Sequence, residues 1–524
     1  MSTNPETAAP TGRKKIAQGQ ERSDDALGHE SPNTSSTDGA KASGELPNGW
    51  RRVAIKDMAD SIQYGHTASA VERKDGPRFL RITDIQDGRV DWSSVPSCDI
   101  PKEDIPKYRL TSGDLVFART GATTGKSFLI GDCPDAVFAS YLIRVRVSAG
   151  VDSRYLSAFF QSPDYWRQIE GGKRGIGQPN VNGTVLGEVQ FPIAPLPEQR
   201  CIVAEIEKQF TRLEAGVAAL KRVQANLKRY RAAVLKAACE GRLVPTEAEL
   251  RKDEGRRMKD ETKRAKSADS TSSFIPHPSS FESGEALLAR ILNERRQNWQ
   301  GRGQYKEPIA LDTAKLFQLP AGWTWTTLDA LAEIKGGITK DQNRKHTAPA
   351  RSVPYLRVAN VQRGYIDLTE VKEIVTTEDE IRELALKRGD ILFNEGGDRD
   401  KLGRGWVWNG ELPECIHQNH VFRARLYVGA FNPKLVSWYA NTFGQKFFFD
   451  EGKHTTNLAS ISMSKLKGLP VPIPPLAEQT RIVAEVERRL SVVEELEAVV
   501  SANLQRATRL RQSILQKAFT GELV

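Results

Sequence analysis

Two stretches of the chain, 195–244 and 475–524, place apolar residues three and four positions apart over many turns. In the first stretch the apolar positions are Val203, Ile206, Phe210, Leu213, Val217, Leu220, Leu227 and Val234. In the second they are Val483, Val486, Leu490, Val493, Val500, Leu504, Ala507 and Ile514. This spacing predicts two long helices, each with one side that needs a partner helix. The simplest partner is the other helix of the same chain, and pairing between two chains is the alternative.

The two predicted helices belong to an internal repeat. The segment "PLPEQRCIVAEIEKQF" from Pro195 returns as "PLAEQTRIVAEVERRL" from Pro475, and both copies run without a gap to a final Gly-x-Leu-Val. Weaker matches lie upstream, where "LPNGW" (46–50) pairs with "LPAGW" (319–323) and "LTSGDLVF" (110–117) pairs with "LKRGDILF" (386–393). The pattern predicts a duplicated chain in which each globular module is followed by a long helix.

The two modules, 46–194 and 319–474, are predicted to have a mixed α+β fold of the α/β class. The runs "DLVFAR" (114–119) and "DILFN" (390–394) are typical of buried strands. The runs "YLSAFFQSPDYWRQI" (155–169) and "LVSWYANTFGQKFFF" (435–449) predict one helix in each module, packed on those strands. Related frameworks with diverged loops indicate two recognition units that read different targets.

Two segments lie outside the modules and the long helices. Residues 1–45 contain almost no large apolar side chains, so we expect a disordered tail. Residues 245–318 are rich in charge and are predicted to be a solvated linker with one short amphipathic helix at 284–300.

Composition narrows the class of protein only modestly. The 76 Lys and Arg against 66 Asp and Glu give a net charge of +10, which favours an anionic partner but equally fits a basic protein without one. The five cysteines have no paired spacing, which suits a reducing cytoplasm. Because the chain has no apolar run of about 20 residues, we expect a cytoplasmic protein with no membrane contact.

The loop "RTGATTGKS" (119–127) resembles a phosphate-binding loop but has the wrong spacing. A Walker A loop has four residues between its glycines, whereas Gly121 and Gly125 have three between them. The backbone N–H and hydroxyl groups of such a loop can instead bond DNA phosphates or base edges, and Lys126 can neutralise a phosphate. The alternative is a turn with a purely structural role.

The second module replaces that loop by "NEGGDRDKLGRGW" (394–406), which is followed by "CIHQNH" (415–420). Gln418 and Asn419 can form paired hydrogen bonds to adenine, so 417–420 is either a base-reading strand or a core segment. Cys415, His417 and His420 lack the fourth ligand of a usual zinc site, so no metal is expected. The polar loops 178–182 and 453–457 are further candidates for DNA contact.

Arg144 and Arg423 occupy equivalent strand positions and are either DNA contacts or internal salt bridges. The full set of candidate DNA-binding residues is Arg119, Thr120, Gly121, Thr123, Thr124, Lys126, Ser140, Tyr141, Arg144, Gln178, Asn180, Asn394, Arg399, Lys401, Arg404, His417, Gln418, Asn419, His420, Arg423, Lys453 and His454.

The doubled "PLPEQRCIVAEI" and "PLAEQTRIVAEV", each opening a long helix behind a diverged module, resemble the specificity subunit of type I restriction-modification enzymes. The loops quoted above resemble its target-recognition motifs, and "ALLARILNERRQNW" (286–299) with "YKEP" (305–308) resembles the linker of its longer members. The resemblance covers about 46–524.

The resemblance implies two target-recognition domains that read the halves of a bipartite DNA site, with an antiparallel coiled coil as the spacer between them. It also implies two methylation subunits as partners, which would carry S-adenosylmethionine, and restriction subunits, which would carry ATP and the Mg²⁺-dependent nuclease. The chain itself would bind no cofactor and catalyse no reaction.

Rival interpretations are a self-contained DNA methyltransferase or NTPase, and a coiled-coil scaffold whose modules bind sugar or protein. The adenine-methylase tetrapeptide is absent from the sequence, and no Gly-rich S-adenosylmethionine loop is evident. The spacing of Asp164, Glu170 and Lys173 also departs from that of a Mg²⁺ nuclease. These observations oppose an enzyme.

Overall fold

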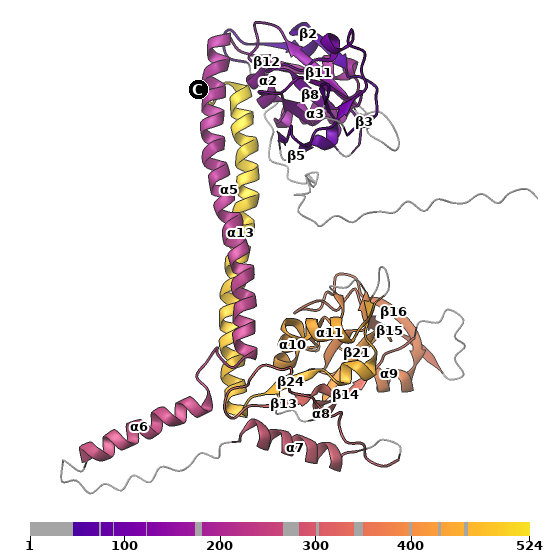
Figure 1. Ribbon diagram of the computed structural model, residues 1–524, viewed down its shortest axis with the longest axis vertical. Coiled ribbons are helices and arrows are strands. Elements are labelled where there is room, and N and C mark those ends of the chain that lie inside the picture. The colour runs from indigo at the N-terminus through magenta and orange to yellow at the C-terminus, as the bar shows by residue number, and fades with distance from the viewer. Residues whose placement is uncertain are drawn as a thin grey trace, which may run out of the picture.

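The computed structural model describes residues 46–72, 75–86, 88–121, 123–172, 181–265, 282–299, 303–339, 349–397, 401–427, 431–454 and 459–524. Two globular modules lie on the same side of a long pair of helices, one module near each end (Figure 1). The tail that the sequence predicts at 1–45 lies outside the described residues. No helix in the described ranges combines the length and apolar character that a bilayer span requires.

The long helices are α5 (Leu196–Cys239) and α13 (Leu476–Thr520), and they pack against each other in opposite directions (Figure 1). At their interface, Leu227 of α5 packs against Val493 and Val500 of α13. Ion pairs flank this seam at two levels, Arg231 with Glu497 and Arg511 with Glu214, each at 3.1 Å. The expected pairing of each helix with its repeat is therefore confirmed, and the fold is the predicted mixed α/β class around a coiled coil.

The first module is built on two four-stranded sheets and several short helices. One sheet has the antiparallel order β2 (Ala59–Tyr64), β11 (Leu142–Val147), β8 (Leu115–Ala118) and β9 (Ser127–Leu129). The other has the order β10 (Ala136–Phe138), β4 (Arg78–Leu80), β7 (Ser97–Cys98) and β3 (Ala70–Val71). The remaining elements are β1 (Arg51–Ala54), η1 (Ile55–Asp57), η2 (Ile82–Asp84), β5 (Ile85–Gln86), β6 (Arg89–Val90), α1 (Ile105–Tyr108), α4 (Gly183–Gly187) and β12 (Gln190–Ile193).

The second module repeats this plan. Its main sheet has the antiparallel order β14 (Ala332–Lys335), β21 (Val421–Leu426), β17 (Ile391–Asn394) and β19 (Gly405–Val407). Two smaller sheets are β16 (Lys372–Thr377), β15 (Ala350–Leu356), β20 (Ile416–His417), and β18 (Gly396–Gly397), β23 (Ala459–Ser460), β22 (Lys453–His454). The remaining elements are β13 (Thr324–Thr327), α8 (Leu328–Leu331), α9 (Glu378–Leu384), α12 (Met463–Lys467) and β24 (Pro470–Ile473).

The single helix predicted in each module is in fact a pair of helices. The first module has α2 (Ser153–Phe159) and α3 (Pro163–Gly172), and the second has α10 (Pro433–Thr442) and α11 (Gly444–Glu451). In the first module a new helix begins at Pro163, because proline suits the first turn of a helix. The Ser162 hydroxyl also accepts a hydrogen bond from the Tyr165 N–H at 3.3 Å, which caps this helix.

The charged linker contains a helix that the sequence reasoning missed, α6 (Glu247–Ala265), and the expected short helix, α7 (Gly284–Gln297). The missed signal is a capping box, in which the Thr246 N–H bonds Glu249 at 2.8 Å and the Glu249 N–H bonds the Thr246 hydroxyl at 3.2 Å. Helix α6 projects away from both modules, whereas α7 buries Leu287 and Ile291 in the second module's core (Figure 1).

The far end of each long helix completes the core of the other module. Ile514, Leu515, Ala518 and Phe519, at the end of α13, are buried in the first module's core, where the Phe519 ring meets Tyr155 edge-on at 5.1 Å. The second module's core likewise takes in Val234, Ala238 and Cys239 from the end of α5.

The repeated Gly-x-Leu-Val ends mark the turns at which these helices stop. Both glycines have left-handed backbones, with φ of +67° at Gly241 and +79° at Gly521. A Cβ at Gly241 would lie 2.5 Å from Pro320 Cγ, and a Cβ at Gly521 would lie 2.1 Å from Pro47 Cγ. Each glycine thus meets the "LPxGW" segment of the opposite module at a distance that no side chain tolerates.

The repeated "PLxEQ" entry uses its polar residues to fix each helix to its own module. The Trp50 indole donates to Glu198 at 3.0 Å, and the Trp323 indole donates to Glu478 at 2.8 Å. The buried amide of Gln199 accepts from the Asp152 N–H at 2.9 Å, and that of Gln479 accepts from the Asn432 N–H at 3.1 Å. Burial raises the pKa of the Glu478 carboxyl.

Adjacent residues of α13 allow a matched test of the coiled coil. Val493 is 1% exposed and its neighbour Val492 is 47% exposed. We expect Val493→Lys to lower the free energy of unfolding by several kcal/mol, because it buries an unpaired ammonium group. Val492→Lys keeps its charge in water and should leave the value within about 0.5 kcal/mol of wild type. Urea unfolding of both variants checks this, and equal losses would contradict the observed seam.

Candidate nucleic-acid interface

The Gly-Thr-Lys loop of the first module is the hairpin turn between β8 and β9. Gly121 and Gly125 both have left-handed backbones, with φ of +82° and +87°. The Thr124 N–H and hydroxyl both bond the Gly121 carbonyl, at 3.1 and 2.7 Å, so the loop closes on itself. The glycines therefore serve the turn, which accounts for the Gly-rich composition of this loop.

A second turn lies beside this loop and joins β10 to β11. The Arg119 N–H bonds the Tyr141 carbonyl at 3.0 Å, and the Val181 N–H bonds the Arg119 carbonyl at 3.0 Å. The Arg119 guanidinium stands 5.1 Å from the centre of the Tyr64 ring. Tyr141 is 62% exposed, and the Lys126 side chain is also exposed. The structure thus brings together the first-module candidates Arg119, Thr120, Gly121, Thr123, Lys126, Ser140 and Tyr141.

The second module has the same arrangement of backbone. The Glu395 N–H bonds the His420 carbonyl at 2.9 Å, and the Ile461 N–H bonds the Glu395 carbonyl at 2.8 Å. Strand β23 pairs with both β18 and β22, so the backbone of Lys453 and His454 lies beside the loop after β17. The structure thus brings together the second-module candidates Lys401, Arg404, Gln418, Asn419, His420, Lys453 and His454.

Five candidates are buried, and for these the prediction of a DNA contact is corrected. They are Thr124, Arg144, Asn394, His417 and Arg423, all at most 5% exposed. Each makes at least one hydrogen bond inside its module. For example, Arg144 donates to the Arg109 carbonyl at 2.7 Å and to Gln63 at 2.6 Å, and Arg423 donates to the Glu383 carbonyl at 3.2 Å.

These buried residues stabilise the interior of the modules and do not contribute to their surface. The Asn394 amide donates to the carbonyls of Val358 and Val361 at 3.2 and 2.9 Å, which secures the start of the second loop. The His417 ring donates through Nδ1 to the Val421 carbonyl at 2.6 Å, across the turn 418–420. The choice left open for Arg144 and Arg423 is decided in favour of internal bonds.

Three candidates, Gln178, Asn180 and Arg399, lie outside the described residues. Across the described ranges, no three His, Cys, Asp or Glu side chains gather closely enough to hold a metal ion. Sequence reasoning missed Glu395, which occupies the backbone position of Arg119. Its signal was available, because aligning the two "GD-strand" repeats places Glu395 opposite Arg119.

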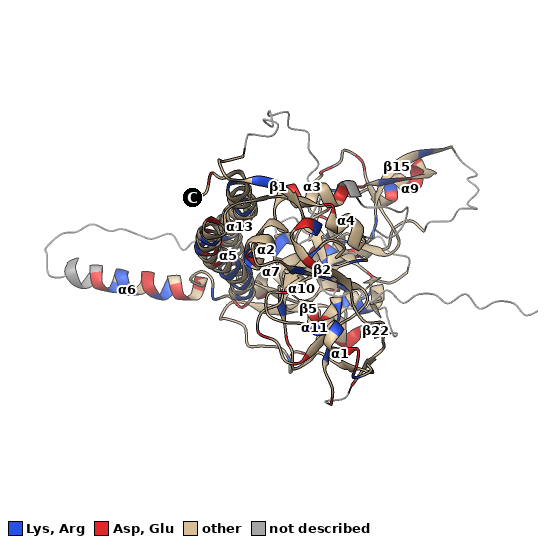
Figure 2. Ribbon diagram, turned by 90° about the horizontal axis from the view of Figure 1, so that it is seen from above, with Lys and Arg blue, Asp and Glu red and all other residues tan. Residues whose placement is uncertain are grey.

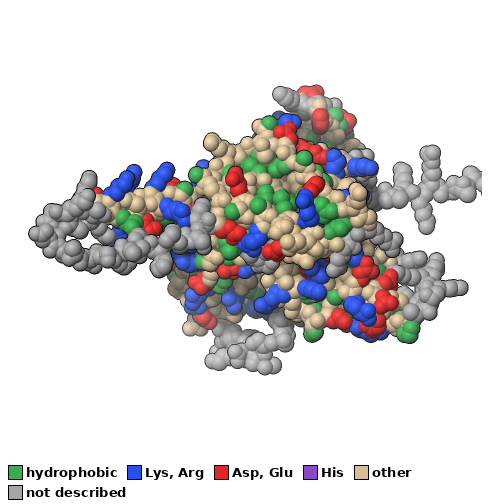
Figure 3. Space-filling model, turned by 90° about the horizontal axis from the view of Figure 1, so that it is seen from below, with side chains coloured by type: hydrophobic (Ala, Val, Ile, Leu, Met, Phe, Trp, Pro, Cys, Tyr) green, Lys and Arg blue, Asp and Glu red, His purple; other side chains and the backbone are tan. Residues whose placement is uncertain are grey.

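Charge is spread rather than gathered over much of the molecule. Acidic and basic residues are interspersed on both modules and along α6 (Figure 2). From below, Lys and Arg side chains stand along α6, and both signs are mixed elsewhere on that face (Figure 3). The net charge of the chain therefore does not locate an interface by itself.

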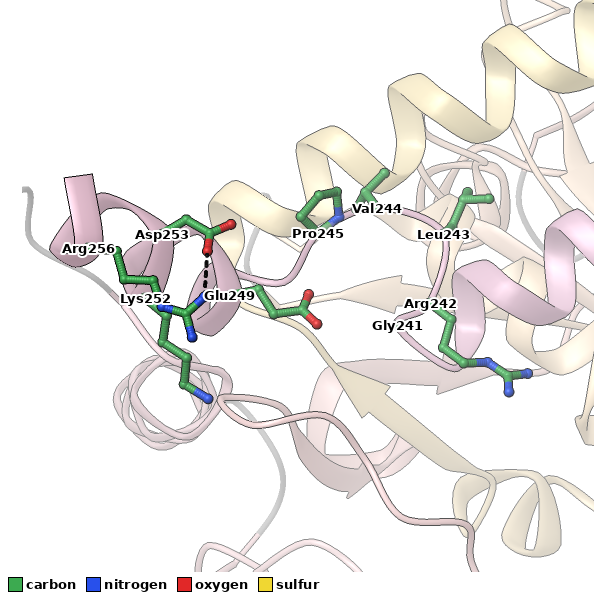
Figure 4. A pocket seen from close by; sticks show the side chains of 9 residues that line it. All are labelled: Gly241, Arg242, Leu243, Val244, Pro245, Glu249, Lys252, Asp253 and Arg256. Atoms are coloured by element: carbon green, nitrogen blue, oxygen red, sulfur yellow. Dashed lines mark ion pairs between the residues drawn. The ribbon is translucent and has the colours of Figure 1, made fainter. Parts of the chain in front are cut away.

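An open cavity of about 700 Å³ lies at the turn between α5 and α6. It is lined by 241–245 and by the first turns of α6, where Asp253 pairs with Arg256 at 3.8 Å (Figure 4). The lining comes from the lower end of the coiled coil and includes none of the candidate DNA-binding residues.

Comparisons with known proteins all point to the same class of protein, the type I restriction specificity subunits. The family "Type I restriction modification DNA specificity domain" matches residues 47–221. The chain is 23% identical to the type I restriction enzyme EcoKI specificity subunit of Escherichia coli (strain K12), over 92% of this chain and 91% of that protein. It is 24% identical to the EcoBI specificity subunit of Escherichia coli, over 91% and 87% of the two chains.

A solved structure of a type I R-M system matches with a TM-score of 0.58 at 20% identity, covering 92% of this chain and all of that one. That likeness establishes the shared fold. Residues 47–221 therefore match a type I restriction modification DNA specificity domain, and over nearly its full length the chain is similar to type I restriction enzyme specificity subunits.

The buried His417 makes stability depend on pH. Burial, the largest cause, lowers the pKa of His417 to about 4. The pKa of this histidine in the unfolded chain is near 6.5. Between pH 6.5 and 4 the unfolded chain therefore binds a proton at His417 and the folded chain does not, so the free energy of unfolding falls as the pH drops through this window. We expect wild type to lose up to about 3 kcal/mol more than His417→Gln over that window. Parallel curves of unfolding free energy against pH would contradict this.

Proposed function

We propose that this chain is the DNA sequence-recognition subunit of a type I restriction-modification complex, with each module reading one half of a bipartite, asymmetric site. One observation carries the proposal. The two modules present the same backbone arrangement at Arg119–Tyr141 and at Glu395–His420, but place different side chains on it. A constant framework with exchanged polar side chains suits two readers of different base sequences.

The coiled coil sets the distance between the two readers. Helix α5 has 44 residues, which corresponds to a rod of about 65 Å at 1.5 Å per residue. Because each end of the pair is buried in a module core, the separation of the modules is fixed by the helix length. The number of unread base pairs between the half-sites follows from this rigid spacing.

An apolar stripe on the coiled coil is the proposed docking surface for the methylation subunits. Val492, Leu496 and Val499 of α13 are 47%, 45% and 56% exposed, and their spacing places them on one side of the helix. Val223 and Tyr230 of α5 are 42% and 45% exposed, and their spacing of seven residues places them on one side of α5. A row of large apolar side chains on a two-helix rod suits further helices of a partner.

The chemistry belongs to the partners in this proposal. S-adenosylmethionine would be held by the methylation subunits, and ATP and Mg²⁺ by the restriction subunits. This chain would supply sequence specificity and assembly, since its polar loops offer hydrogen-bond donors and acceptors at the surface rather than a nucleophile with an adjacent base.

The proposal is tested by methylation of a randomised bipartite duplex library with the methylation partners present. Wild type should select one asymmetric site, and selection of none would refute the function. Lys126→Ala should weaken all sequences alike and lower the slope of log K against log salt by about one, because it removes one phosphate contact. Lys252→Ala, on the projecting helix α6, is the matched control and should leave the slope unchanged.

A substitution in the apolar stripe should weaken association with the methylation subunits. Leu496→Lys should weaken association with the methylation subunits at least about tenfold, because it places a charge in an apolar contact. Ala498→Lys, on a different side of the same helix, should leave association near wild type. Titration by analytical ultracentrifugation measures both, and thermal unfolding confirms that both variants fold. Equal effects of the two variants would show that the stripe is not the docking surface.

A further inference from the structure

The second module exposes a carboxylate at the position where the first module has a cation. Glu395 and Arg119 each follow the central strand of the module sheet, and each makes the same two backbone bonds, to the turn after β20 or β10 and to the segment before the long helix. His420 correspondingly occupies the backbone position of Tyr141. The pair Arg119–Tyr141 is thus replaced by the pair Glu395–His420.

The replacement pair is partly exposed, and its two side chains bond each other. His420 Nδ1 lies 2.6 Å from Glu395 Oε2, and the side chains are 54% and 30% exposed. The carboxylate accepts from the Nδ1–H, so that ring atom is held against Glu395. Within the described ranges, neither the other carboxylate oxygen nor His420 Nε2 makes a hydrogen bond, so both can bind a ligand. Both side chains are more exposed than His417, which is fully buried and bonds a backbone carbonyl of the framework.

A carboxylate at a DNA interface has few compatible neighbours. It repels phosphates, so it cannot serve as one of the backbone-positioning contacts that dominate such interfaces. In the major groove, the donors available to it are the exocyclic amino groups, N4 of cytosine and N6 of adenine. Cytosine is the usual partner of Glu, because the adenine edge also presents the N7 acceptor, which a carboxylate cannot satisfy.

From this geometry we infer that Glu395, oriented by His420, is a specificity-determining residue of the second module and accepts a hydrogen bond from the exocyclic amino group of one base, cytosine ahead of adenine. The inference rests on the proposed function. At the equivalent point of the first module, Arg119 offers donors, which suit the O6 and N7 acceptors of guanine. The two halves of the site would then differ in hydrogen-bond polarity at equivalent positions.

The test is Glu395→Gln in the complex with methylation subunits, with base preference measured at every position of the randomised library. We expect the preference for an amino-bearing base to fall about tenfold at one position of the second half-site, with the first half-site and the spacing unchanged. The library separates the two sources of the amino group, because cytosine and adenine are scored independently. Thermal unfolding establishes that the variant folds.

The matched control is Glu411→Gln, an exposed carboxylate at the opposite end of the β17–β19 hairpin, bonded to Asn409 at 2.9 Å. It should leave every base preference unchanged. Three results would overturn the inference: unaltered preferences in Glu395→Gln, a uniform gain of affinity for all sequences, which would mark Glu395 as a merely repulsive surface charge, or an equal effect of Glu411→Gln. If wild type itself shows no second half-site, the proposed function fails instead.

Discussion

The burial of each long helix's far end in the opposite module is the interaction on which the rest of the architecture depends. The end of α13 places Leu515, Ala518 and Phe519 in the core of the first module, and the end of α5 places Val234 and Ala238 in the core of the second. Removing either end would open a core, so the modules cannot move apart without unfolding in part. The coiled coil is consequently a spacer held at both ends.

The same constraint explains the polar residues at the helix entries. Trp50 and Trp323 fix the start of each helix through Glu198 and Glu478, while the opposite helix ends at a glycine beside the same "LPxGW" segment. Each such segment therefore touches both helices. Any residue with a Cβ at position 521 would clash with Pro47. It would also be strained by the left-handed backbone at this position.

With the scaffold fixed, the surface loops are free to diverge. The loops of the second module are held by buried side chains that bond backbone carbonyls, namely Asn394, His417 and Arg423. Neighbouring residues at the surface, such as Glu395 and His420, can therefore change without loss of this framework. This division between bonded framework and exposed side chains is what a protein needs when it must change its target while keeping its assembly.

The sequence by itself determined the duplication, the two long helices, the mixed α/β class and the central strands, because hydrophobic period and repeat alignment are local properties of the chain. The repeated apolar positions that include Leu227 and Val493 indicated a partner helix, and the structure decided that this partner lies in the same chain. Only the tertiary structure decided which polar side chains face solvent. Arg144 and Arg423 look like DNA contacts along the chain, but they are buried because distant carbonyls, such as those of Arg109 and Glu383, lie within reach of their guanidinium groups. Burial of a polar residue depends on which partners the fold brings to it, and no local pattern records that.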